Sequence, residues 1–398
     1  MDDSVGQRII TARRTRRLTQ QELADKAGIS RSYLQKIETG DRPPSHAALI
    51  KLGHAMHLEV SRLTGQPYDA DPGPEDLLVH GVVPEIRRVM LCYRDPVPAL
   101  LPPREFEELA SQVDVVNRHR RAASYAQVAP ALPGLLTELT TYALAQASGS
   151  LAAREAYSLV AQVYRGVNSL AHKLGYADLS TSALERIEWA ACLSEDPLLV
   201  ATAQYLLAGA MLREGAYAPA RRLLTRVEAN LLALDGRDAR GLLGAVLLKR
   251  AMVQARAGDV SAMHSDLNQA AEVGDRLGRD AVFYETSFGP AQVGIYRAAA
   301  AIEIGDYDTA VRDGGALVLP ADMPAERSSH HHIDQAHARL VLGDRSGAWE
   351  SLRAARKKAP LHTRKHPRVR DTVGTLLRLE RADDESHLGY ARWAGVTI

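Results

Sequence analysis

The sequence predicts an all-α protein, in which a small helical head is followed by a long body of stacked helical hairpins. Three observations support this class. Up to about residue 66, short apolar stripes at helical spacing alternate with cap residues. From about residue 104 onward Ala, Leu, Arg and Glu dominate, and the alternation typical of strands is nearly absent. A phrase with a central glycine recurs in this second region, as it does in repeat proteins.

Length and composition place the boundaries of the parts. A chain of 398 residues with 46% hydrophobic residues is long enough for two or three domains. We expect a head at 1–66, a Pro-rich linker with one docked helix at 67–103, a repeat domain at 104–380 and a tail at 381–398. No apolar run approaches the about 18 residues of a membrane span, and the first residues are acidic where a secretory peptide is basic. A cytoplasmic location follows as an expectation.

The head contains the stretch "LTQQELADKAGISRSYLQKIETGDRPPS". Thr19 and Glu22 have the spacing of a capping box, and Gly28 can take the positive φ that ends a helix. Ser30 then caps a second short helix. The outward residues of this second helix are Arg31, Ser32, Gln35 and Lys36. All four can donate to base edges or phosphates and none is acidic, so this face suits a DNA groove.

The stretch resembles the helix-turn-helix domains of the Xre class and of phage repressors. The residues that match the pattern of that family are Gln20, Leu23, Ala24, Gly28, Ser30, Ile37, Glu38 and Gly40. The resemblance implies that Gln20 reaches a phosphate, that α-helical residues Arg31, Ser32 and Lys36 face bases, and that Arg42 lies on the DNA backbone. Gln35 belongs to the same face. Glu38 is expected to be structural, paired with Arg13.

Charge is distributed unevenly along the chain. Residues 1–65 hold eleven Lys or Arg against seven Asp or Glu, a net charge of +4, although the whole chain carries only +1. The remainder is therefore at −3. A basic head on a slightly acidic body is expected where one end of a protein meets phosphates.

The linker is rich in proline, and we expect one helix in it, from Val83 to Tyr93. Beyond it the glycines of the recurring phrase are Gly175, Gly215, Gly258, Gly305 and Gly343, at intervals of 40, 43, 47 and 38. In each phrase one helix ends at the glycine and the next begins. The residues five places after the last four glycines are Ala220, Met263, Ala310 and Ala348. We therefore predict about six helical hairpins, with close packing at each corner.

The repeats resemble tetratricopeptide repeats of irregular length, because the spacing exceeds the about 34 residues of the strict repeat. The phrases "LPGLLTELTTYA" and "FGPAQVGIYRAAAAIEIGD" also resemble regulators of high-GC Gram-positive bacteria that join an Xre head to such a body. In organisation alone the chain is similar to peptide-pheromone receptors, in which a peptide binds the inner wall of the repeats. The residues expected to contact a ligand there are Tyr164, Asn168, Gln204, Arg250, Gln254, Phe288, Gln292, Tyr296 and Arg327.

The remaining sequence patterns say less about function. His330 and Asp334 lie one helical turn apart, but the three histidines at 330–332 point in different directions, so no metal site is expected. The basic stretch from Arg353 to Arg370 is either a second DNA-touching surface or a solvated repeat edge. Cys92 and Cys192 are expected to be buried thiols. No catalytic or phosphate-binding motif appears, so neither an enzyme nor a cofactor is expected.

Together these patterns predict a DNA-binding transcription regulator whose body senses a peptide or small molecule and forms a homodimer on a palindromic operator in double-stranded DNA. Two heads about 34 Å apart read such a palindrome, whereas one head buries too little surface for specific binding. A repressor is favoured over an activator because a docked head blocks polymerase without further contacts. The alternative is a scaffold or antitoxin-like module whose body binds a resident protein.

Overall fold

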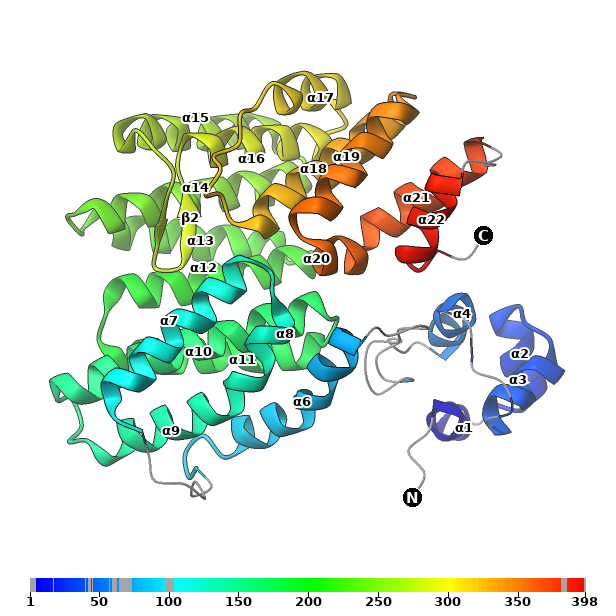
Figure 1. Ribbon diagram of the computed structural model, residues 1–398, viewed down its shortest axis with the longest axis horizontal. Coiled ribbons are helices and arrows are strands. Elements are labelled where there is room, and N and C mark those ends of the chain that lie inside the picture. The colour runs from blue at the N-terminus through cyan, green and yellow to red at the C-terminus, as the bar shows by residue number, and fades with distance from the viewer. Residues whose placement is uncertain are drawn as a thin grey trace. The chain divides into compact units, whose positions relative to one another are not determined.

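The computed structural model describes residues 5–16, 18–39, 41, 44, 46–56, 58, 63, 74–96, 104–380 and 385–396 (Figure 1). Contacts divide the chain into two compact units, which consist of 1–77 with 171–178 and of 78–170 with 179–398. We call helices α1 to α4 the head and the helices from α7 onward the body. None of the helices in the described residues is long and apolar enough to cross a membrane.

The head consists of α1 (Val5–Thr15), α2 (Gln20–Ala27), α3 (Arg31–Thr39) and α4 (His46–Met56). The predicted capping box is present, since the Glu22 backbone N–H donates to the Thr19 hydroxyl and the Glu22 carboxylate accepts from the Thr19 backbone N–H. Gly28 ends α2 with a φ of 59°. The buried side chains of its core include Ile9, Leu23, Leu34, Ile37, Leu49, Leu52 and Met56. The two predicted helices of the turn are therefore confirmed.

The helix expected in the linker is longer than predicted. It begins before Val83, because α6 spans Pro74–Leu91 and contains Pro84 in its interior. An interior proline removes one helical hydrogen bond and is unfavourable by about 3 kcal/mol. Val79, Val83, Ile86 and Met90 are buried at helical spacing on both sides of it. Burial of this continuous apolar stripe offsets the unfavourable effect of the proline. The same stripe, visible in the sequence, indicates a helix that begins before Val83.

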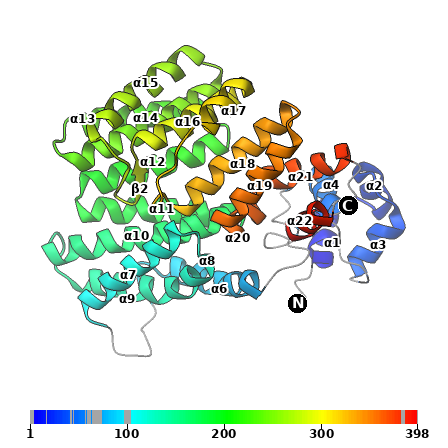
Figure 2. The same cartoon turned by 45° about the horizontal axis from the view of Figure 1, so that its top comes forward.

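The body begins with α7 (Phe106–Arg121), α8 (Tyr125–Val128), a 3-10 turn (Ala129–Ala131) and α9 (Leu132–Ala145). Five hairpins follow in the described chain. They are α10 (Leu151–Lys173) with α11 (Ala177–Ser194), α12 (Pro197–Arg213) with α13 (Tyr217–Leu232), α14 (Arg237–Ala257) with α15 (Val260–Leu277), α16 (Pro290–Glu303) with α17 (Tyr307–Gly315), and α18 (Ala325–Val341) with α19 (Arg345–Lys358). Figures 1 and 2 show the last four of these hairpins stacked in chain order.

The corners of the five hairpins lie where the sequence placed them. Each corner glycine has a positive φ, between 74° at Gly215 and 83° at Gly305 and Gly343, which side chains other than glycine rarely adopt. The four residues five places after the last four glycines are buried, with exposed fractions of 0% or 1%. The first helices pack side by side, α12 on α14, α14 on α16 and α16 on α18. We call the shared face of these first helices, together with α10, the inner wall.

Between α15 and α16 the chain forms a β-hairpin that the sequence did not predict. Strands β1 (Ala281–Phe283) and β2 (Thr286–Phe288) pair antiparallel and lie along α14 (Figure 1). Phe288 is fully buried over Gly244, where a Cβ would lie 2.0 Å from its ring. Phe283 covers Gly241 in the same way, at 2.2 Å. The two glycines of α14 therefore leave the space that the aromatic rings of the hairpin fill.

The C-terminal end is also helical. Helices α20 (Pro360–Lys365), α21 (Pro367–Glu380) and α22 (Glu385–Trp393) follow the last hairpin. Tyr390 of α22 is buried with Trp349 of α19, and its hydroxyl donates to the carbonyl of Leu352. From the sequence we expected a tail at 381–398. Of that segment, residues 385–396 are described, and they pack onto the repeats.

Candidate functional site

Helix α3 presents one buried and one exposed face in the head. Leu34, Ile37 and Glu38 are buried. The donors predicted to meet DNA are all exposed, and they are Arg31, Ser32, Gln35 and Lys36. The hydroxyl of Ser30 accepts from the backbone N–H of Tyr33, which caps the helix at its first turn. The exposed face thus offers two cations and two neutral polar groups on a helix that is fixed at its N-terminus.

A buried carboxylate holds α3 to the rest of the head. Glu38 is 5% exposed and accepts hydrogen bonds from Arg13 at 2.7 and 3.0 Å. The predicted pair of Arg13 with Glu38 is therefore confirmed. Gln20 also donates to Glu38, from Nε2 to Oε2 at 2.7 Å. Its amide is thus engaged inside the head, and its predicted contact with a phosphate stays a prediction. Arg42 lies outside the described residues.

Several of the predicted ligand residues are engaged within the body. Arg250 forms ion pairs with Glu228 and Asp266, and Gln254 donates to the same Asp266 at 2.6 Å. Asn168 accepts from the hydroxyl of Ser180 at 2.8 Å. These side chains bind partners on their own hairpin or, for Arg250 and Glu228, on the preceding one, which leaves them little capacity for a ligand.

Four more of the predicted ligand residues are buried or face a groove. Phe288 belongs to the core under the β-hairpin, and we leave it out of the proposed ligand site. Tyr164 and Gln292 are buried at 0% and 1% exposed, and among the described residues the hydroxyl of Tyr164 and the side-chain carbonyl of Gln292 have no hydrogen-bond partner. Gln204 faces a groove of about 940 Å³ between α12 and α13, which Leu207 also lines.

Tyr296 and Arg327 do meet on the inner wall. Nη1 of Arg327, on α18, lies 3.5 Å from the hydroxyl of Tyr296 on α16. Tyr205 of α12 lies near both groups and contributes to the electrostatics of Arg327 and Tyr296. The inner wall thus brings polar side chains of α12, α16 and α18 together, and its concave shape stays a prediction.

The sequence reasoning missed the lysine at the centre of this wall. Nζ of Lys249 lies 3.6 Å from the centroid of the Tyr205 ring, a cation–π geometry. The pKa of Lys249 is lowered to about 7, mainly by burial and in smaller part by the positive charges of Arg327, Arg213 and Arg165, while Tyr296 opposes them. The signal that could have found it is a lone pair of bases in the apolar run "GLLGAVLLKRAMV".

A second missed contact joins the β-hairpin to the first helices of the body. Glu285 at the tip forms ion pairs with Arg120 and Arg121, both at 2.5 Å. Arg165 of α10 donates to the backbone carbonyls of Tyr284 at 2.8 Å and Glu285 at 2.7 Å. Burial lowers the pKa of Arg165 to about 9. The hairpin is thus tied to α7 and α10, more than a hundred residues earlier in the chain.

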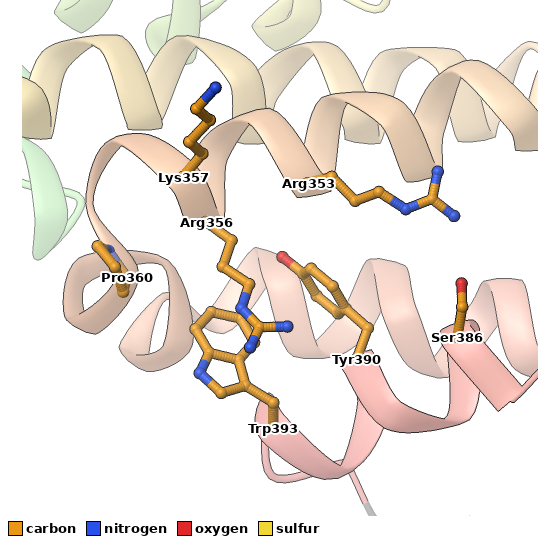
Figure 3. Close-up of a pocket in the computed structure, with 7 residues that line it drawn as sticks. All are labelled: Arg353, Arg356, Lys357, Pro360, Ser386, Tyr390 and Trp393. Carbon is orange, nitrogen blue, oxygen red and sulfur yellow. The ribbon is translucent and has the colours of Figure 1, made fainter.

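The basic stretch near the C-terminus lines a cavity of about 510 Å³ (Figure 3). Arg353, Arg356 and Lys357 lie on one side and Tyr390 and Trp393 on the other. The guanidinium of Arg356 lies 4.2 Å from the centroid of the Trp393 ring. Among the residues that the structure describes, no group of histidines, cysteines or acids could hold a metal ion. Cys192 is exposed and Cys92 is partly exposed, so the expectation of buried thiols was wrong.

Comparison with known proteins bears on the head. Residues 9–63 match the helix-turn-helix family HTH_3. A stretch of 63 residues is 44% identical to the immunity repressor protein of Bacillus phage phi105, covering 16% of this chain and 44% of that protein. The chain thus spans less than half the length of this curated relative. The predicted resemblance of the head to helix-turn-helix domains and to a phage repressor is confirmed.

One solved structure overlaps with most of the chain. It is the crystal structure of Bacillus thuringiensis PlcR in complex with the peptide PapR7 and DNA, which covers 88% of this chain and 99% of its own, at 12% identity and a TM-score of 0.34. The two chains superimpose too loosely at this score to be equated.

Proposed function

We propose that this chain is a sequence-specific DNA-binding transcription regulator. The observation that carries the proposal is the outward face of α3, where Arg31, Ser32, Gln35 and Lys36 are exposed together and no acid interrupts them. The match of residues 9–63 to a helix-turn-helix family supports it, as does the net charge of +4 on residues 1–65. Arg and Lys read guanine in the major groove, and Gln pairs with adenine.

The proposal includes a homodimer. One helix-turn-helix domain contacts too few base pairs for the usual specificity, and paired heads read two half-sites about 34 Å apart on one face of the duplex. We assign the pairing of heads to the body, and we favour repression over activation. Selection from a random duplex library with the intact chain tests sequence-specific binding and the pairing of two heads. Enrichment of an inverted repeat supports them, and enrichment of no motif contradicts the proposal.

The body is proposed to bind a signal, a peptide or a small molecule, on the inner wall. Tyr296, Arg327 and Lys249 support this because their polar groups converge there from three different helices. A ligand changes DNA binding only if its affinity differs between two arrangements of the heads, and ordinary coupling corresponds to about 5- to 150-fold.

Hydrogen exchange and operator affinity, measured together with extracts of the source cells, test this part. A signal should protect α12, α14 and α16 from exchange and change operator affinity in parallel. Protection without a change in affinity contradicts signalling. A macromolecule recovered on the body, in place of a small signal, would favour the alternative of a resident protein partner.

A further inference from the structure

Three positive side chains gather on the inner wall near the C-terminal end of α12. A Cβ placed on Gly209 would lie 2.8 Å from Nζ of Lys249 and 3.8 Å from Nη1 of Arg213, so both cations lie over the same turn of α12. Arg327 reaches toward them from α18 and lies beside the Tyr296 hydroxyl. Because residue 209 has no side chain, the ammonium of Lys249 can lie close against the helix.

In the described part of the chain, none of the ion pairs involves Lys249, Arg213 or Arg327. The acids that act on the two arginines are their sequence neighbours, Glu214 and Glu326. The buried Arg120 and Arg250, by contrast, are paired with carboxylates.

A cluster of partly buried like charges is unfavourable unless something supplies the opposite charge. Such a cluster on a partly exposed wall is a candidate binding place for a charged ligand. The two tyrosine hydroxyls at the same place add neutral donors, and an arginine presents a fork that matches the two oxygens of a carboxylate. Arg213 is the last residue of α12, Lys249 lies within α14 and Arg327 lies in the first turn of α18, so side chains of three helices build the site.

We propose that Lys249, Arg213 and Arg327 form a site for a carboxylate group of the ligand, with the hydroxyls of Tyr205 and Tyr296 as neighbouring donors. As a ligand subsite of a sensor it rests on the proposed function of the body. As an anion site it can be tested without knowledge of the signal. The carboxylate of a peptide C-terminus and that of an acidic metabolite share this chemistry.

Binding at this site is coupled to a proton. The groups that face Lys249 from the neighbouring helices are Arg165 on α10, Tyr205 and Arg213 on α12, Tyr296 on α16 and Arg327 on α18. Without an anion the pKa of Lys249 is about 7. A bound carboxylate favours the charged ammonium and raises this pKa, so binding takes up a proton and weakens as the pH rises above neutral.

Lysine-selective ¹³C labelling of the intact chain tests the site by nuclear magnetic resonance. The Cε signal of each lysine is titrated with pH in chloride, in acetate and in inorganic phosphate at equal ionic strength. Lys249 is assigned by the signal that Lys249→Met removes, or Lys249→Arg should the first variant not fold. We expect acetate to move the pKa of Lys249 from about 7 to about 8 or above, and to leave the other lysines unchanged.

Arg327→Gln provides a matched variant. It removes a repelling charge, so it should raise the pKa of Lys249 in chloride and at the same time reduce the effect of acetate. A merely structural role for Arg327 would not produce these two opposite changes. Identical titrations of Lys249 in chloride and acetate would overturn the site, and a response to phosphate alone would overturn its assignment to a carboxylate.

The outcome is separable from the proposed function. DNA binding by the same preparation is measured independently of acetate. A protein that binds its operator but shows no response of Lys249 to acetate contradicts only the carboxylate site. A protein that responds to acetate but selects no DNA sequence contradicts only the regulator.

Discussion

Replacing Lys249 by Met should stabilise the protein at neutral pH. Core positions usually lose stability when they are changed, but this position carries a partly buried cation among other cations. Met keeps the length of the side chain and its contact with the Tyr205 ring, on which Nζ lies at 3.6 Å from the centroid. The substitution therefore removes an unfavourable charge while it retains most of the packing.

The magnitude follows from the pKa of Lys249, which is lowered from 10.5 to about 7. Each pKa unit corresponds to about 1.4 kcal/mol, so the unfavourable term approaches roughly 4 kcal/mol at pH 7. Loss of the cation–π contact removes part of that gain. We expect Lys249→Met to raise the free energy of unfolding by about 2 to 4 kcal/mol at pH 7.

The sign of the pH dependence is fixed by the direction of the shift. The folded pKa of Lys249 lies below the unfolded one, so between pH 7 and about 10 the unfolded chain binds more protons. The free energy of unfolding of the wild type therefore rises with pH over this window. The variant lacks this contribution, and the difference between the two proteins should shrink toward zero near pH 10.

Urea unfolding followed by far-ultraviolet circular dichroism, at pH 7 and at about pH 10, measures this difference. Other groups that titrate in the window are common to both proteins and cancel. Lys26→Met, an exposed lysine of α2, is the control and should change stability little. If Lys249→Met were less stable than the wild type at pH 7, or if the difference did not depend on pH, the reasoning about a repelled cation would be wrong.

Three further predictions follow from the same structure. Glu285→Gln should lower the free energy of unfolding by about 3 kcal/mol, because it leaves Arg120 and Arg121 without a counter-charge. A loss below about 1 kcal/mol in urea unfolding would show that these ion pairs do not hold the β-hairpin to α7. Gly244→Ala should displace Phe288 and lower the free energy of unfolding by about 1 to 3 kcal/mol in the same measurement. Gly81→Ala is the control and should not lower it, because a Cβ there meets nothing within 4 Å. Operator affinity should fall steeply with salt in a titration from low to moderate ionic strength, and a flat dependence would exclude phosphate contacts by the basic head.

Acid stability has a defined direction at the same hairpin. Burial alone would raise the pKa of Glu285, but the charges of Arg120 and Arg121 hold it below its ordinary value. A carboxylate whose folded pKa is lowered stabilises the fold above its unfolded pKa. That contribution is lost as the pH falls below the ordinary range of a glutamate and through the folded value.

The helices of the body could be predicted because their corners have a local chemical signature. Gly175, Gly215 and the three later glycines mark points where only a residue without a side chain takes the required φ easily. That signature depends on the chain itself and not on its neighbours. The packing of small residues after each corner follows from the same local geometry, so sequence reasoning reached it too.

The β-hairpin could not be predicted in the same way. Its turn residues, Tyr284 and Glu285, have φ values of 45° and 60° but are neither Gly nor Asn, the residues that announce a tight turn. The turn is held by Arg165 and by the arginines of α7, which lie far away in the sequence. Tertiary contacts therefore override the local preference, and a single sequence does not show them.

The candidate DNA-binding face was predictable and the inner wall was only partly so. The exposed residues of α3 follow from helical spacing alone. On α14, Lys249 and Arg250 are adjacent and about 100° apart around the helix. Which of them faces the wall depends on how the hairpins pack. Arg250 turns to Asp266 inside its own hairpin, while Lys249 turns to α12. The sequence named Arg250 and not Lys249, and a ligand contact of Arg250 stays a prediction.

The most direct test of the central claim is the affinity of the intact protein for single-base variants of its selected operator. Arg31→Ala and Lys36→Ala should each weaken binding by about 1 to 3 kcal/mol and abolish the preference at one base pair in each half-site. Lys51→Ala, an exposed cation on α4, should leave the base preference unchanged. If both α3 variants kept the full affinity and the full preference of the wild type, α3 would not be the element that reads DNA.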